Sequence, residues 1–198
     1  MPLFLSLFFF LNVAFAQDFQ LIKHEVSFKI PYTFGMHKGE VKELEGSFNL
    51  KSTGRLSTPI KSLRTDKATM DCHLQESLGL DYSKSDFPDS HVCDDDKLPA
   101  DGGNSIVFPQ IDFQIQEINV IEKTNDTIVI KIKGAWNIHG KSKNEQYQLT
   151  LQKQNNEWVS ELNLKLRLSD FAVIVKKFMF IKVEDTVTLK LKLFWDQK

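Results

Sequence analysis

Residues 128–138 read IVIKIKGAWNI and hold the clearest structural pattern in this sequence. Every second position, from Ile128 through Gly134 and Trp136 to Ile138, is apolar or glycine, and the positions between are mostly polar or small. Side chains alternate between the two faces of a β-strand, so this pattern predicts a strand with one buried face.

The same period of two recurs along the chain. The apolar sets are Val26, Phe28, Ile30; Leu44, Phe48, Leu50; Ile111, Phe113, Ile115; Tyr147, Leu149, Leu151; Leu162, Leu164, Leu166, Leu168; and Val187, Leu189, Leu191, Leu193, Trp195. With the polar turns between them, they predict strands near 20–30, 41–51, 56–68, 106–118, 127–138, 144–152, 157–168 and 178–195. So many half-buried strands predict an all-β fold, a single antiparallel barrel of about eight strands, because closure removes exposed sheet edges. A barrel of this size can enclose one small ligand.

One segment has helical rather than strand periodicity. Met70, Leu74 and Leu78 recur every fourth residue and Gly79 follows, which predicts a short helix over 69–79. A long loop is expected over 81–105, and a loop of that length in a compact domain is usually functional.

The N-terminus has the pattern of an export signal. Residues 1–16 carry no charge, are mostly apolar and end in Ala14-Phe15-Ala16, so we expect cleavage after Ala16 and a mature domain over 17–198. The apolar run is too short to span a bilayer, and no second candidate follows, so no integral membrane segment is expected.

Charge argues against nucleic acid as a partner. The 25 basic and 26 acidic residues give a net charge of −1, without a basic field. Lysines alternate with apolar residues, as at Lys131 and Lys133 or Lys190 and Lys192, which is typical of the outer face of a strand. We favour that interpretation over a patch for an anionic surface.

Several stretches together resemble a known family. They are HEVSFKI (24–30), LEGSFNL (44–50), MDCHLQESL (70–78), SDFP (85–88), GAWNIHGKSK (134–143), LRLSDF (166–171) and VEDTV (183–187). Their order and spacing resemble the YceI-like, polyisoprenoid-binding proteins over about 20–195. The resemblance implies a lipocalin-like barrel, exported to the periplasm, that holds an isoprenoid or other long-chain amphiphile in an elongated apolar cavity. The segment 89–105 is longer than in the simplest members.

The inner-face positions are the candidates for lining such a cavity. They are Val26, Phe28, Ile30, Phe48, Leu50, Phe113, Ile115, Ile132, Trp136, Ile138, Leu164 and Leu166. The same residues would equally form a solid core, and periodicity does not separate the two. The alternative function is therefore a non-catalytic envelope stress or structural protein with a filled barrel that acts through protein contacts. The oligomeric state stays open, a homodimer included.

The two cysteines, Cys72 and Cys93, favour a disulfide, because the chain is expected to be exported and their number is even. A zinc site that adds His73 and His91 is disfavoured, since adjacent helical residues point about 100° apart. The acidic run at 94–96 lacks the spacing of a calcium loop.

Nothing in the sequence indicates catalysis. The five histidines lie far apart, and no nucleophile-elbow, zinc-protease or phosphate-loop motif is present. We expect no enzyme activity, no catalytic residues, no cofactor and no bound metal.

Overall fold

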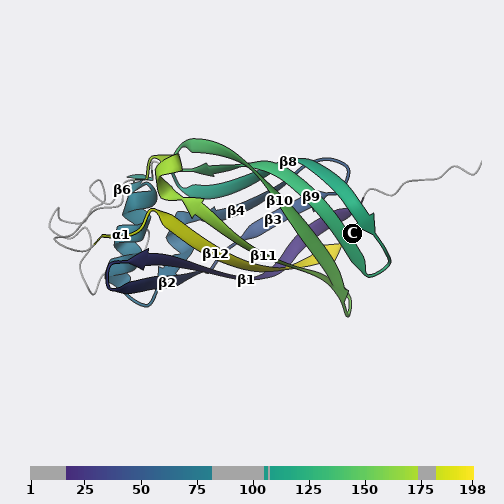
Figure 1. The fold of residues 1–198 in the computed structure, drawn as a ribbon, viewed down its shortest axis with the longest axis horizontal. Coiled ribbons are helices and arrows are strands. Elements are labelled where there is room, and N and C mark those ends of the chain that lie inside the picture. The colour runs from purple at the N-terminus through teal and green to yellow at the C-terminus, as the bar shows by residue number, and fades with distance from the viewer. Residues whose placement is uncertain (1–16, 82–104, 107, 174–181) are drawn as a thin grey trace, which may run out of the picture.

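The computed structural model describes residues 17–81, 105–106, 108–173 and 182–198. Figure 1 shows a barrel of long slanting strands with a short helix at one end. The elements are β1 (Asp18–Tyr32), β2 (Gly35–Val41), β3 (Glu45–Asn49), β4 (Gly54–Pro59), η1 (Ile60–Ser62), β5 (Leu63–Thr65), α1 (Ala68–Leu78), β6 (Leu80–Asp81), β7 (Ser105–Ile106), β8 (Gln110–Lys123), β9 (Thr127–Ile138), β10 (Lys141–Gln154), β11 (Glu157–Arg167), η4 (Leu168–Phe171) and β12 (Thr186–Gln197). The expected signal peptide (1–16) and most of the expected loop (82–104) lie outside the described residues.

The predicted closed antiparallel barrel is confirmed. The eight-strand ring runs β1, β12, β11, β10, β9, β8, β4, β3 and returns to β1. β1 closes it by pairing along its length with β12 on one side. On its other side, residues 18–20 pair with β3 and residues 26–32 pair with β2. β2 and β5 therefore extend the sheet beside the ring rather than within it.

Local backbone requirements explain the β9–β10 hairpin. Ile138 pairs with Lys141, which leaves a two-residue turn of His139 (φ 50°) and Gly140 (φ 70°). Two positive φ values give the turn a twist that matches the flanking strands. Inside the barrel, a Cβ on Gly134 would lie 2.7 Å from the Phe113 ring, so this glycine leaves the space that the ring fills.

Three strand predictions were wrong in detail. The expected strand 41–51 omitted β2, whose inner positions His37 and Gly39 give no apolar alternation. The expected strand 56–68 breaks after Pro59, which has no N–H for the ladder and is followed by η1. Of the expected strand 178–195, residues 178–181 lie outside the described residues, and 182–185 precede β12, which begins at Thr186.

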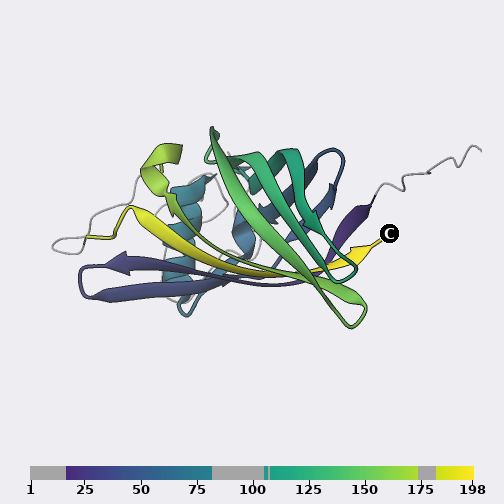
Figure 2. The same cartoon turned by 45° about the vertical axis from the view of Figure 1, so that its right-hand side comes forward.

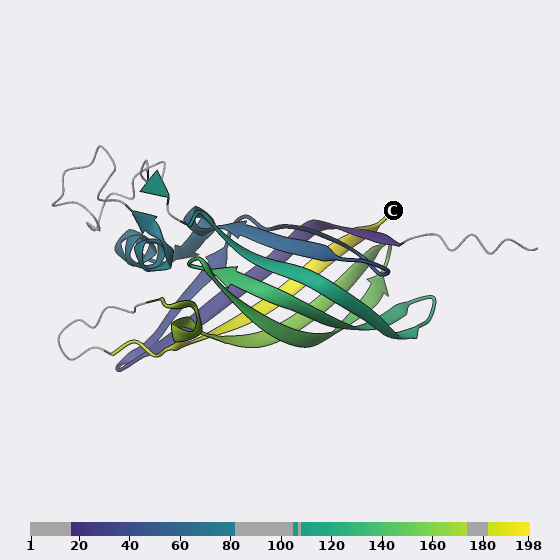
Figure 3. The ribbon, with the colours of Figure 1, turned by 90° about the horizontal axis from the view of Figure 1, so that it is seen from above.

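The two ends of the barrel are filled differently. At the end near the C-terminus, Phe19 stacks on Phe48 with ring centroids 4.7 Å apart, and Trp158 and Trp195 pack edge-on against them. The indole N–H of Trp195 donates to Ser160 Oγ at 2.9 Å, so this dense aromatic cluster has its buried donor paired. Figure 3 shows α1 at the opposite end.

Candidate functional site

The barrel interior contains an apolar void of about 110 Å3 next to α1, and only apolar atoms face it. Strands supply most of its wall, while Leu74 and Leu78 reach it from the helix. Its lining residues are Val26, Phe28, Ile30, Val41, Leu44, Leu56, Thr58, Leu63, Leu74, Leu78, Ile111, Trp136, Ile138, Leu166, Leu168, Val187, Leu189 and Leu191. This space suits a hydrocarbon and offers no polar group to a headgroup.

A second, smaller apolar void of about 40 Å3 lies between the first and the aromatic cluster. It is lined by Phe48, Leu56, Phe113, Ile115, Ile130, Ile132, Trp136, Tyr147, Leu149, Leu162, Leu164, Leu191, Leu193 and Trp195. The two voids therefore follow one another along the barrel interior.

Three side chains separate the voids. Leu56, Trp136 and Leu191 line both of them, so we call these residues the partition. The Trp136 indole N–H donates to Tyr147 Oη at 2.9 Å, which holds the largest partition side chain in place. Burial raises the pKa of the Tyr147 phenol above its usual range, and the hydrogen bond from Trp136 offsets part of that rise. The phenol therefore stays neutral at physiological pH and accepts the indole N–H as an uncharged group.

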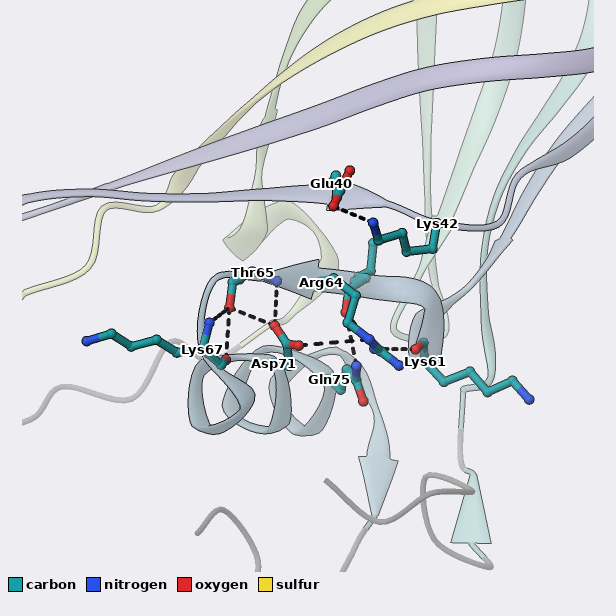
Figure 4. A network of polar contacts seen from close by, with 9 residues as sticks. Glu40, Lys42, Lys61, Arg64, Thr65, Lys67, Asp71 and Gln75 are labelled. Atoms are coloured by element: carbon teal, nitrogen blue, oxygen red, sulfur yellow. Dashed lines mark hydrogen bonds and ion pairs between the residues drawn. The ribbon is translucent and has the colours of Figure 1, made fainter. Parts of the chain in front are cut away.

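A polar network fixes α1 across its end of the barrel (Figure 4). The buried Asp71 carboxylate accepts hydrogen bonds from Thr65 N at 2.5 Å and Thr65 Oγ1 at 2.6 Å. The buried Gln75 amide donates to the Leu63 carbonyl at 3.1 Å. Because both partners belong to β5, the helix is tied to the sheet by hydrogen bonds as well as by Leu74 and Leu78.

The predicted helix is confirmed, but the residues it buries were only partly foreseen. Leu78 is buried, while Met70 and Leu74 are half-buried. Among the helix positions whose burial is described, the most deeply buried are Asp71, Cys72 and Gln75. The polarity of Asp71 and Gln75 gave no sign of their burial in the apolar pattern.

Some of the residues that carried the family resemblance, from 139–143, 169–171 and 185, lie at the α1 end and join its loops. Lys143 Nζ lies 2.7 Å from Asp170 Oδ2, which joins β10 to η4. Ser169 donates to Asp185 from Oγ at 2.6 Å and from its backbone N–H at 2.8 Å. The hydroxyl bond is the main cause that lowers the pKa of the Asp185 carboxyl. His139 lies in the hairpin turn, with Nδ1 3.3 Å from the Phe171 carbonyl oxygen.

All twelve predicted lining residues are buried, and all but Leu50 border one of the two voids. Leu50 lies just beyond β3 and borders neither. Their contact with a ligand remains a prediction. Sequence reasoning missed Leu74 and Leu78, because strand periodicity carries no information on a helix that covers the barrel end. It also left out Leu56 and Leu191, although Leu191 belongs to a clear alternating set.

Another hollow, of about 470 Å3, lies on the outside of the barrel. Its walls carry charges of both signs, and its lining residues are His24, Glu25, Val26, Ser27, Glu40, Val41, Glu161, Lys190 and Lys192. His24 Nε2 lies 3.3 Å from the Val41 carbonyl oxygen. Mixed charges on an open surface provide no apolar enclosure, so we place the candidate ligand site in the interior.

Most of the candidate disulfide and metal-binding residues lie outside the part of the chain that the structure describes. Cys72 is 1% exposed, while Cys93, His91 and residues 94–96 lie outside the described residues. The disulfide therefore stays a prediction. Among the described residues, no group of three or more metal-ligating side chains occurs. None of the helices in the described part is long and apolar enough to cross a membrane.

Comparison with known proteins agrees with this geometry. A model of the YceI-like domain matches residues 20–194. A polyisoprenoid-binding domain from Saccharophagus degradans, implicated in plant cell wall breakdown, superposes with a TM-score of 0.63 at 10% identity, covering 92% of this chain and 99% of that one. Burkholderia cenocepacia BcnA gives a TM-score of 0.62 at 13% identity, covering 86% and 95%. The Campylobacter jejuni YceI protein gives 0.53 at 18% identity, covering 79% and 82%. No curated protein sequence matches the chain.

Proposed function

Because this chain belongs to the YceI-like family, we propose that it binds and carries an isoprenoid or another long-chain amphiphile inside its barrel. The observation that carries the proposal is the pair of apolar voids that share the partition as a common wall. A polyisoprenoid-binding protein with the same fold supports the ligand class. Binding would rest on burial, at about 25 cal/mol per Å2 of apolar surface removed from water.

The size of the voids determines how such a ligand would enter. Their volumes of about 110 and 40 Å3 are below the ~300–1,000 Å3 of typical ligand pockets. A long chain must therefore displace side chains. We propose that the Trp136 ring leaves the partition, so that both voids join into one channel between α1 and the aromatic cluster.

The same small volumes favour one second candidate, an envelope protein with a filled barrel that acts through protein contacts. In that case the voids are packing defects, and the interior never opens. The two functions differ in whether purified protein carries a lipid.

Extraction and mass spectrometry of the native protein test the proposal directly. We expect close to one long-chain lipid per protein after purification without detergent. The matched control is protein denatured and refolded in lipid-free buffer, which should bind an added polyisoprenoid alcohol and recover the same complex. If the native protein contains no lipid and does not bind the added polyisoprenoid alcohol, the filled barrel is favoured.

Export to the periplasm, with cleavage after Ala16, is the location that we propose for this function. Support comes from the composition of residues 1–16 and their small-x-small ending. N-terminal sequencing of the periplasmic fraction should begin at Gln17. Protein that retains Met1, or that stays in the cytoplasm, would contradict this location.

A disulfide between Cys72 and Cys93 is part of the same proposal. It would tie α1 to the segment that follows it and contribute about 3 kcal/mol, the chain-entropy value for a loop of this length. Thiol counting in denaturant should find no free thiol before reduction. Two titratable thiols in protein from the periplasmic fraction would contradict the disulfide.

A further inference from the structure

The hairpin of β1 and β2 carries exposed apolar side chains at its tip and lysines directly below them. Phe34, in the turn, is 73% exposed, and Met36 is 44% exposed. Met36 lies opposite Pro31 in the pairing of the two strands. Two residues further along each strand, Lys38 lies opposite Lys29. Alternation puts both pairs on the outer face of the hairpin, which stands clear of α1 at that end of the barrel (Figure 2).

Cross-strand register extends this positive charge around the barrel. Lys29 lies opposite Thr188 of β12, and Thr188 lies opposite Lys165 of β11. Lys190 follows two residues after Thr188 on the same face. We call Lys29, Lys38, Lys165 and Lys190 the basic row. All four are exposed, and none takes part in an ion pair found among the described residues.

Sheet stability does not account for the basic row. Like charges directly opposite one another in a sheet are destabilising. On the same outer face, Lys192 shows the usual solution, because it lies opposite Glu25 on one side and Glu161 on the other. The Lys29–Lys38 pair departs from that arrangement at the point where the exposed apolar tip begins.

We propose that this face docks on a lipid bilayer that contains anionic phospholipid. Phe34 and Met36 enter the boundary between headgroups and acyl chains. Lys29, Lys38 and Lys165 lie at the level of the phosphates, and Lys190 lies two residues further from the tip. A strand rises about 3.3 Å per residue, so Met36 and Lys38 differ in level by roughly 7 Å. That spacing fits the ~5–10 Å depth to which interfacial apolar side chains are buried. A protruding apolar tip suits a deformable bilayer better than a protein surface, which would need a matching pocket.

Docking goes beyond the proposed carrier function and does not depend on it, since the face is complete without a ligand in the barrel. Vesicle binding tests it with protein of known lipid content. The full mature chain is sedimented with vesicles of phosphatidylglycerol and phosphatidylcholine in equal parts, and separately with vesicles of phosphatidylcholine alone. We expect binding to the anionic vesicles only, and a decline as salt screens the lysines.

Test variants, each compared with a control variant, show which surface of the barrel binds the vesicles. Each lysine near an anionic surface contributes roughly fivefold in binding, so K29Q/K38Q should weaken binding by about 25-fold. The charge-matched control K131Q/K153Q alters exposed lysines of β9 and β10 and should change it by less than about threefold. F34S/M36S should weaken binding at least about tenfold. Its control is I121S, which alters an apolar residue of β8 that is 57% exposed.

Two results would overturn the proposal: no binding of wild-type protein to anionic vesicles, or equal losses in the test and control variants. Either result would favour a protein, rather than a bilayer, as the partner that binds this face. Unchanged thermal unfolding of the four variants confirms that each is folded. A protein that docks but carries no lipid would contradict only the carrier function, and one that carries lipid but does not dock would contradict only this inference.

Discussion

Trp136 illustrates how one buried side chain can define the capacity of an interior. Its position in the alternating stretch predicts that it faces inward, and the structure places it between two voids with its N–H held by Tyr147. The ring therefore presents an apolar surface to both voids, while its hydrogen bond to Tyr147 fixes its orientation. Ligand length should depend on this residue more than on any other lining position.

The variant Trp136→Ala should join the two voids and shift binding toward longer chains. Loss of the ring should destabilise lipid-free protein by about 3 kcal/mol, the lower end of the range for such truncations, because empty space already borders the ring on both sides. Thermal unfolding and affinity for a series of isoprenoid alcohols measure both effects.

Leu50→Ala is the matched control, since Leu50 is buried but borders neither void. It should cost about 2–5 kcal/mol and leave chain-length preference unchanged. The channel model is wrong if Trp136→Ala lowers stability without any change in ligand preference.

The ionisation of Asp185 makes the free energy of unfolding depend on pH. Hydrogen bonds from Ser169 lower its folded pKa below the ordinary value of 3.8, so its contribution is present above that value and is lost as pH falls through the folded pKa. Asp185→Asn should reduce the free energy of unfolding at neutral pH by about 1 kcal/mol, the net value of one hydrogen bond. The difference from wild type should shrink below pH ~4. Urea unfolding across pH checks this, and a pH-independent difference would contradict it.

At the scale of elements, α1 closes one end of the barrel through hydrogen bonds to β5. Its buried polar residues, Asp71 and Gln75, satisfy backbone and hydroxyl groups of Leu63 and Thr65 that would otherwise lose partners. Arg64 adds its guanidinium, with Nε 3.9 Å from Asp71 Oδ2. Such an attachment specifies one position of the helix, whereas an apolar contact alone would tolerate sliding.

Asp71→Ala should destabilise the protein by about 2 kcal/mol, since hydrogen bonds to charged groups contribute about 1.5–3 kcal/mol and the Thr65 donors lose their acceptor. It should also speed ligand release, because α1 supplies Leu74 and Leu78 to the larger void. His73→Ala, at an exposed position of the same helix, should stay within about 0.5 kcal/mol of wild type. Urea unfolding and ligand exchange rates measure the pair. Equal rates in the two variants would show that α1 does not control access.

At the scale of the whole molecule, the interior is a column: the aromatic cluster, a small void, the partition, a larger void and α1. The aromatic cluster lies near the C-terminus and borders the smaller void with Phe48 and Trp195, so stacked rings fill that end of the column. The larger void borders the helix, so ligand exchange is expected at the α1 end.

Val187→Phe should fill the larger void. Val187 borders it, and the added ring atoms have space to enter, so stability should change by less than about 1.5 kcal/mol while ligand binding is lost. Leu151→Phe is the control, at a fully buried position that borders neither void. It should cost about 1–3 kcal/mol through overpacking and keep ligand binding. Thermal unfolding and ligand titration distinguish the two, and retained binding in Val187→Phe would contradict the assignment of this void.

The sequence by itself determined the class of fold. Alternation in stretches such as 128–138 depends only on the two-residue period of an extended backbone, so it predicted inward residues, strands and closure without any knowledge of partners. The helix near 69–79 followed from its own period in the same way. These features are local, because the period of a strand or a helix is set by residues that are close together in the sequence.

Only the tertiary structure decided what the interior and the surface can do. The partition unites Leu56, Trp136 and Leu191 from three different strands, and the basic row sets Lys29 opposite Lys38 through strand register. The sequence suggested that alternating lysines form ordinary outer faces, which holds for Lys192 between two glutamates. Register and void volume arise from long-range pairing and packing, and no short window of residues contains them.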